Sequence, residues 1–78
     1  MKTVLISFGT KDRAKKFVDM VNDFNSHFDL NVGQYTVDAK SILGVLSIDL
    51  RKKVELKIFE RDDEMDRIMD VIKPYLVA

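Results

Sequence analysis

Ser41 is the residue of this sequence whose type and setting are best suited to chemistry. It follows Ala39 and Lys40 and precedes an apolar run, residues 42–48, that contains one glycine. A serine at such a junction typically caps a helix, because its hydroxyl accepts a hydrogen bond from a backbone amide. A phosphate on that hydroxyl would lie at a helix N-terminus with Lys40 as its charge partner, which favours an anion. Ser41 is therefore a predicted helix cap in a setting that favours a negative charge.

The apolar run after Ser41 is a candidate docking surface. A short helix cannot turn every apolar side chain toward a core, so some of them must be exposed. We assign Val45 and Ile48 to the core. For Ile42, Leu43 and Leu46 two interpretations stay open, namely completion of the core or a patch that binds a partner together with Lys40.

Three other groups of residues are weaker candidates. His27 is the only histidine, and we expect it on the surface near the C-terminal end of the first helix, where the helix dipole favours a cation. A basic group on the first helix is more typical of a solvated face than of an anion site. The acidic group over residues 60–66 lacks the glycine and final glutamate of an EF-hand. We therefore expect no metal and no cofactor.

Length and composition predict one small globular domain, residues 1–78. Thirteen basic and thirteen acidic side chains cancel, which argues against a protein that binds nucleic acid or an anionic membrane. The absence of cysteine excludes disulfides and thiolate chemistry. The first apolar run is too short for a signal sequence or a membrane span, so a cytoplasmic location without membrane insertion is expected.

The periodicity of apolar residues predicts seven elements. Thr10 or Asp12 is expected to cap the first helix and Asp62 the last one, and Pro74 is expected to kink or fray the last helix. Glycine at the first position of the pair Gly33–Gln34 suits a two-residue hairpin turn. The elements are a strand over residues 2–8, a helix from residue 12 that frays around 25–27, strands over 28–32 and 35–37, a helix over 41–48, a strand over 53–58 and a helix from about 63 to 76.

Each long helix has one apolar stripe and each strand one apolar face. The simplest arrangement is a four-stranded antiparallel sheet with the helices covering one face. The residues expected to face the long helices are Val4, Ile6, Val37, Leu56 and Ile58.

The segment from Ala39 to Leu50 resembles the regulatory-serine segment of HPr, the small phosphocarrier of bacterial phosphoenolpyruvate-dependent sugar phosphotransferase systems. The resemblance spans nearly the whole chain and implies an HPr-like open-faced α+β sandwich of order βαββαβα. A ferredoxin-like module of the ACT type, which binds small molecules, has nearly the same element order and is the alternative. The short helix that begins at Ser41 favours the HPr fold.

The resemblance also implies a changed phosphoryl site. It places Thr10 where the family has its phosphocarrier histidine, Asp12 where the family has an arginine that steadies the phosphoryl group, and Arg13 where it has a proline. Threonine forms an ordinary phosphoester rather than a phosphoramidate, and Asp12 repels phosphate where an arginine would pair with it. We therefore expect no catalytic residue and no histidine phosphotransfer.

Serine-only relatives of this kind serve in carbon-catabolite regulation, so the resemblance implies a regulatory or partner-binding protein. Ser41 is then the phosphoacceptor of an HPr kinase, and Ile42, Leu43 and Leu46 dock on a transcriptional regulator or on phosphotransferase-system proteins. Two alternatives remain, which are a phosphocarrier that uses another phosphoacceptor and the ACT-type binding module.

Overall fold

The computed structural model describes residues 1–77 and confirms the predicted order of strands and helices. A 3₁₀ helix, η1, follows the last α-helix. The elements are β1 (Lys2–Ile6), α1 (Lys11–Asn22), β2 (His27–Val32), β3 (Tyr35–Asp38), α2 (Ile42–Leu46), β4 (Val54–Phe59), α3 (Met65–Ile72) and η1 (Lys73–Tyr75).

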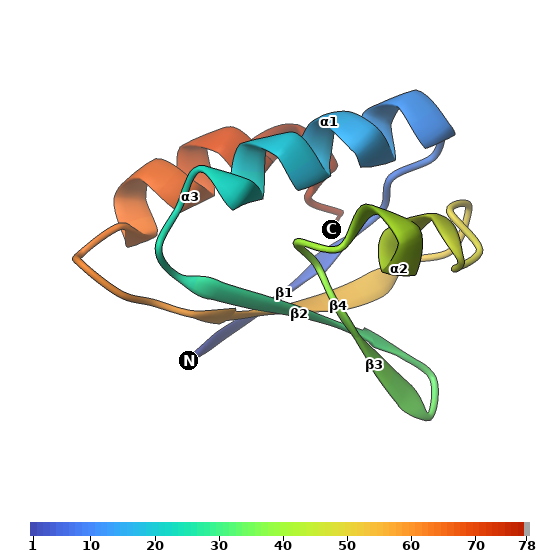
Figure 1. Ribbon diagram of the computed structural model, residues 1–78, viewed down its shortest axis with the longest axis horizontal. Coiled ribbons are helices and arrows are strands. Elements are labelled where there is room, and N and C mark those ends of the chain that lie inside the picture. Colours follow the sequence, from blue (N-terminus) through green and yellow to red (C-terminus); the bar gives the residue numbers. More distant parts are fainter. Residues whose placement is uncertain (78) are drawn as a thin grey trace.

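The four strands form one antiparallel sheet in the order β1-β4-β2-β3 (Figure 1). Leu56 of the central strand β4 pairs with Val4 of β1 and with Leu30 of β2, and Leu30 pairs in turn with Val37 of β3. These four apolar side chains make one row across the sheet, because directly paired residues point to the same face. The row confirms the expected inward orientation of Val4, Val37 and Leu56.

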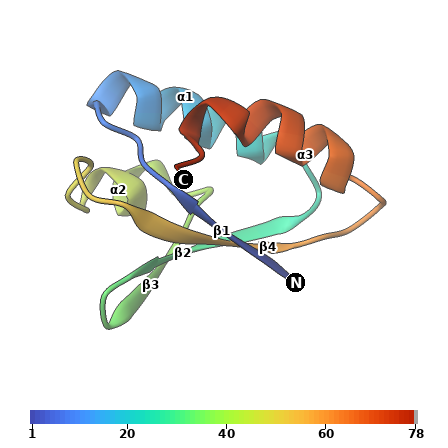
Figure 2. The ribbon, with the colours of Figure 1, turned by 180° about the vertical axis from the view of Figure 1, so that it is seen from behind.

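Helices α1 and α3 lie side by side over one face of the sheet, and α2 lies beside α1 over the β3 end (Figures 1 and 2). Within residues 1–77 no helix covers the other face, which we call the open face. The core lies between the layers and includes Ile6, Phe17 and Ile58, which are fully buried. No helix within residues 1–77 combines the length and apolar content that crossing a bilayer needs.

The first strand is shorter than the alternation of apolar residues predicts. β1 ends at Ile6 rather than at residue 8, although Phe8 is still fully buried. The chain then turns at Gly9, whose φ of 82° suits glycine. The Gly9 amide donates to the Leu50 carbonyl at 2.8 Å and so ties the start of α1 to the segment before β4.

The start of the last helix corrects a prediction. Asp62 does not cap α3, because Asp62 and Asp63 both adopt left-handed backbone conformations, with φ of 56° and 53°. The N-cap position is taken by Glu64, which makes no side-chain capping bond. The Met65 amide instead donates to the Glu60 carboxylate at 3.0 Å.

The chain beyond α3 behaves as Pro74 predicts. The α-helix ends at Ile72, and Pro74 lies within η1, because proline lacks the amide hydrogen that a continuing α-helix needs. The segment after η1 runs beside β1, where the Val77 amide donates to the Leu5 carbonyl at 3.0 Å.

Candidate phosphorylation and docking site

Ser41 caps α2, as its place in the sequence predicts. Its backbone is extended, with φ −94° and ψ 112°, and its Oγ accepts from the Gly44 amide at 3.2 Å. A Cβ at Gly44 would lie 2.7 Å from Cγ1 of Val37, so only glycine lets α2 approach β3 this closely. The Ser41 residue is exposed.

The side chains of α2 divide into an exposed pair and a buried set. Leu43 is 81% exposed and Ile42 is 38% exposed, whereas Val45 is fully buried and Ile48 is nearly so. Leu46 is half-buried and packs against the core. The exposed part of the predicted docking patch is therefore formed chiefly by Ile42 and Leu43, next to Ser41.

Lys40 has a different environment from the one expected. Its ammonium donates to the Phe24 carbonyl at 2.6 Å, and Nζ lies 5.8 Å from the centre of the Phe28 ring. The side chain is therefore engaged at the end of α1 rather than free beside the Ser41 hydroxyl. A phosphate on Ser41 would have to compete for this ammonium.

Thr10 is the N-cap of α1. Its Oγ1 accepts from the Arg13 amide at 3.2 Å. The guanidinium of Arg13 is turned toward the C-terminal segment, where Nη2 donates to the Pro74 carbonyl at 2.7 Å and Cζ lies 4.9 Å from the centre of the Tyr75 ring. The Arg13 guanidinium is thus held by the C-terminal segment rather than by the Thr10 hydroxyl.

Thr10 and Ser41 lie at opposite ends of the α1–α2 pair. The amide of Asn22, the last residue of α1, donates through Nδ2 to the Lys40 carbonyl at 3.1 Å. At the other end, Gly9 bonds to Leu50, beyond the end of α2. The structure therefore brings Ser41, Ile42 and Leu43 together and leaves Thr10 apart from them.

The sequence profile of the family described as "PTS HPr component phosphorylation site" matches residues 9–77, which is most of the chain. The chain belongs to the HPr family. HPr proteins are phosphocarriers of the phosphotransferase system rather than catalytic enzymes, and they act by binding other proteins of that system. Membership in this family decides against the ACT-type alternative, which rested on element order alone.

Solved HPr structures share the fold. The crystal structure of HPr-C-His from Thermoanaerobacter tengcongensis superposes with a TM-score of 0.76 at 29% identity, covering 96% of this chain and 91% of that one. The phosphocarrier protein HPr from Bacillus anthracis str. Ames gives a TM-score of 0.70 at 22% identity, with 97% and 94% covered. A comparison with curated protein sequences finds no significant match.

The single histidine of this HPr-family chain lies on the sheet, which corrects the expected position at the end of α1. His27 is the first residue of β2, and its side chain is half exposed. Nε2 lies 2.7 Å from Oδ1 of Asp29, and the ring is 5.6 Å from that of Phe59. The strand that was predicted to begin at Phe28 begins one residue earlier, at His27.

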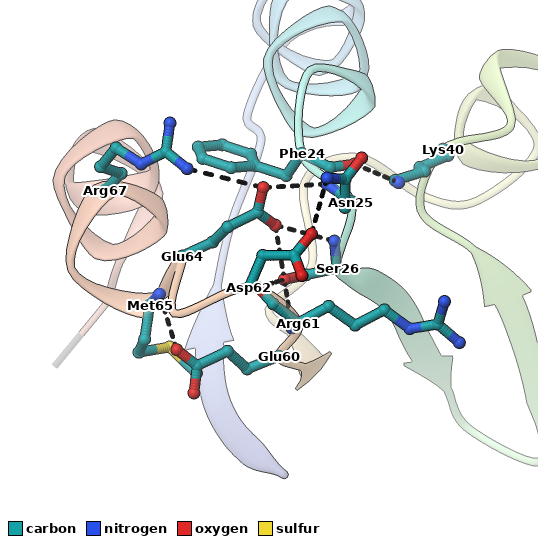
Figure 3. Close-up of polar contacts among 10 residues, drawn as sticks. All are labelled: Phe24, Asn25, Ser26, Lys40, Glu60, Arg61, Asp62, Glu64, Met65 and Arg67. Atoms are coloured by element: carbon teal, nitrogen blue, oxygen red, sulfur yellow. Dashed lines mark hydrogen bonds and ion pairs between the residues drawn. The ribbon is translucent and has the colours of Figure 1, made fainter.

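Sequence reasoning missed a buried carboxylate. Glu64 is 3% exposed, and its two oxygens accept from the Asn25 amide at 3.1 Å and from the Ser26 amide and hydroxyl, both at 2.8 Å (Figure 3). Arg67 lies 3.6 Å away. Glu64 stands in an acidic run that looks solvated, so only its position one turn before the buried Ile68 could have signalled it.

The pKa of Glu64 reflects these contacts. Burial raises the pKa of the carboxyl, but the hydrogen bonds from Asn25 and Ser26 and the charge of Arg67 lower it by more. The net pKa lies below the ordinary value of 4.5, so the carboxylate stays ionised at neutral pH. Its contacts join the α1–β2 connection to the start of α3.

Two substitutions separate the structural role of Ser41 from any regulatory one. Ser41→Ala removes the acceptor for the Gly44 amide, so we expect a loss of about 0.5–2 kcal/mol in the free energy of unfolding. Ser41→Asp keeps an acceptor and adds a charge that the helix dipole favours, so its stability should stay near that of the wild type. Urea unfolding of the three proteins measures this, and equal loss in both variants would contradict the capping role.

Proposed function

We propose that this HPr-family chain is a regulatory, partner-binding protein that acts through Ser41 and α2 and does not carry phosphate on a histidine. The observation that carries the proposal is the residue at position 10. The family resemblance assigns the phosphocarrier histidine to this position, and here a threonine occupies it as the N-cap of α1.

The surroundings of Thr10 support the loss of phosphoryl transfer. A histidine phosphoramidate can pass its phosphate on, whereas a threonine phosphoester is a poor donor. Asp12 adds an exposed carboxylate to the first turn of α1, and a carboxylate repels an incoming phosphoryl group. Arg13 cannot compensate without leaving Pro74 and Tyr75.

The α2 region supports a binding role instead. An exposed serine hydroxyl stands at the start of a helix, and two exposed apolar side chains, Ile42 and Leu43, follow it directly. Exposed apolar side chains at a helix start make a suitable anchor for a partner. The expected partners are an HPr kinase, which would phosphorylate Ser41, and a transcriptional regulator or a phosphotransferase-system protein, which would read the result.

Incubation with phosphoenolpyruvate and the first enzyme of the phosphotransferase system tests the missing chemistry. We expect no acid-labile phosphate on the wild-type chain. Thr10→His should restore little labelling because Asp12 still repels the phosphoryl group, and Thr10→His with Asp12→Arg should restore more. The readout is incorporated phosphate per mole of protein before and after mild acid treatment.

Stoichiometric acid-labile labelling of the wild type would instead establish a phosphocarrier that uses another acceptor. His27 is then the residue to check, because it is half exposed and its Nε2 is paired with Asp29. His27→Gln would abolish labelling in that case and would change nothing under our proposal.

A second experiment tests the regulatory site. Treatment with an HPr kinase from the same host should add one phosphate, which intact-mass spectrometry and peptide mapping locate on Ser41. Leu43→Ser should then weaken binding of the partner about tenfold or more, as loss of a central apolar anchor does. Leu5→Ser, at a partly exposed leucine of β1, is the matched control. An unmodified Ser41 would overturn the regulatory proposal.

A further inference from the structure

One peptide group near the end of α1 is held from both sides by charged side chains. The Phe24 carbonyl accepts from the Lys40 ammonium at 2.6 Å. The amide of Asn25, which belongs to the same peptide group, donates to the Glu64 carboxylate at 3.1 Å. Figure 3 shows Lys40 and Glu64 approaching this peptide from different elements. A peptide bonded at both ends is polarised, and each bond strengthens the other.

Lys40 belongs to the segment that presents Ser41. Its carbonyl accepts from Nδ2 of Asn22 at 3.1 Å, and its amide donates to Oδ1 of Asp38 at 2.9 Å. The backbone beside Ser41 is thus fixed by two bonds that do not involve the ammonium. The Lys40 side chain can therefore change partner without moving the start of α2.

We propose that Lys40 is a switch that couples phosphorylation of Ser41 to the Phe24–Asn25 peptide. This inference rests on the proposed function, in which Ser41 is the phosphoacceptor. A phosphoserine carries a charge of about −1.5 to −2 at neutral pH, whereas the Phe24 carbonyl is a neutral acceptor. The ammonium therefore moves to the adjacent phosphate, because an ion pair adds the attraction of opposite charges to the hydrogen bond, whereas the carbonyl offers only a dipole.

The consequence reaches beyond α2. When Lys40 leaves, the Phe24–Asn25 peptide keeps its bond to Glu64, which is the N-cap residue of α3. Phosphorylation of Ser41 thereby changes the hydrogen bonding of the connection between α1 and β2. A partner that contacts this connection would distinguish the phosphorylated chain from the unmodified one without touching the phosphate.

Nuclear magnetic resonance of the full chain with phosphoserine incorporated at position 41 tests the switch and needs no kinase. Phosphorylation should shift the amide nitrogen of Asn25, because its peptide carbonyl loses a hydrogen bond, and should shift the Nζ resonance of Lys40. Lys40→Met in the unmodified chain should move Asn25 in the same direction and by a similar amount. Lys52→Met, at an exposed lysine before β4, should leave Asn25 unchanged.

The decisive comparison is phosphorylation in the Lys40→Met background, where Asn25 should no longer respond. An Asn25 resonance that is unaffected by phosphoserine, or that shifts equally with and without Lys40, would overturn the switch. The Lys40 Nζ resonance of the wild type gives the same answer if Lys40→Met does not fold. Failure of the kinase to modify Ser41 would refute the proposed function alone, because the installed phosphoserine tests the coupling separately.

Discussion

Truncation of Phe17 to alanine lowers the free energy of unfolding by about 3–5 kcal/mol. Phe17 is fully buried, and its ring centre lies 5.0 Å from that of Phe8 and 5.1 Å from that of Tyr75, both in edge-to-face geometry. The substitution removes this contact between α1, the segment after β1 and η1, and leaves a cavity that the packed rings cannot fill. Urea or thermal unfolding measures the loss.

The expected cost is large for a domain of this size, because small single domains are stable by about 5–15 kcal/mol in total. A variant that is unfolded at 37 °C is within expectation. Ile6→Ala, at a fully buried residue of β1, should cost about 2–5 kcal/mol for the same reason.

Phe59→Ala is the matched control for the aromatic truncation. Phe59 lies on the open face of the sheet and is 38% exposed, with one ring neighbour, His27. Its truncation should cost clearly less than that of Phe17. Equal losses at the two positions would contradict the assignment of the core to the helix-covered face.

Loss of the Glu64 carboxylate destabilises the domain and removes part of its sensitivity to acid. In the wild type the Asn25 and Ser26 amides donate to the two carboxylate oxygens of Glu64. Glu64→Gln keeps the shape of the side chain, but it replaces one of these acceptor oxygens with an NH₂ group, which cannot accept the hydrogen bond. Ser26→Ala, which removes one buried hydroxyl from the same cluster, should cost about 1–3 kcal/mol. Glu64→Gln should have a lower urea midpoint than Ser26→Ala, because it disturbs bonds to both oxygens.

The pH dependence follows from the lowered pKa of Glu64. Because the pKa is lower in the folded than in the unfolded state, the unfolded chain binds more protons in this range and stability increases with pH. The contribution is fully present above the ordinary value of 4.5 and is lost as the pH falls through the lowered pKa. The urea concentration at the unfolding midpoint of the wild type should therefore decrease once the pH is lower than about 4.5. The midpoint of Glu64→Gln should decrease less over the same pH range.

Asp49→Asn is the control for this pH profile. Hydrogen bonds from Arg51 lower the pKa of Asp49 as well, but this ion pair is exposed, and exposed pairs contribute little. Its pH profile should stay close to that of the wild type. A Glu64→Gln profile that parallels the wild type would show that the buried carboxylate does not contribute to acid unfolding.

Local sequence signals predicted the structure correctly where the interacting groups lie within one helix or its cap. The capping of α2 by Ser41 was predictable, because an N-cap hydroxyl bonds to an amide only three residues away. For α1 the same signal left Thr10 and Asp12 as alternatives, and the structure selects Thr10. The fraying of the last helix at Pro74 follows equally from its missing amide hydrogen, although α3 ends at Ile72 and not near the predicted residue 76. The exposure of Leu43 was left open, because a five-residue helix has too few positions to define a buried face.

Predictions failed where distant segments compete for a residue. Asp62 has the chemistry of an N-cap, yet its carboxylate accepts from Nδ2 of Asn25 at 2.8 Å, and its left-handed backbone delays the start of α3. Lys40 was expected to place its charge beside Ser41, yet its ammonium donates a hydrogen bond to the Phe24 carbonyl. In each case the deciding partner lies 16 or more residues away in the chain, so no local pattern reveals it.

The sequence alone determined the element order, the apolar face of each strand and helix, and the HPr resemblance, because apolar periodicity, caps and a contiguous motif are written in neighbouring residues. Only the tertiary structure decided which charged side chains are buried and which of them form hydrogen bonds with distant segments. Glu64 and Asp63 are adjacent acids, but Glu64 is buried and Asp63 is exposed. The difference arises because unpaired amides at Asn25 and Ser26 require an acceptor once the α1–β2 connection packs against α3.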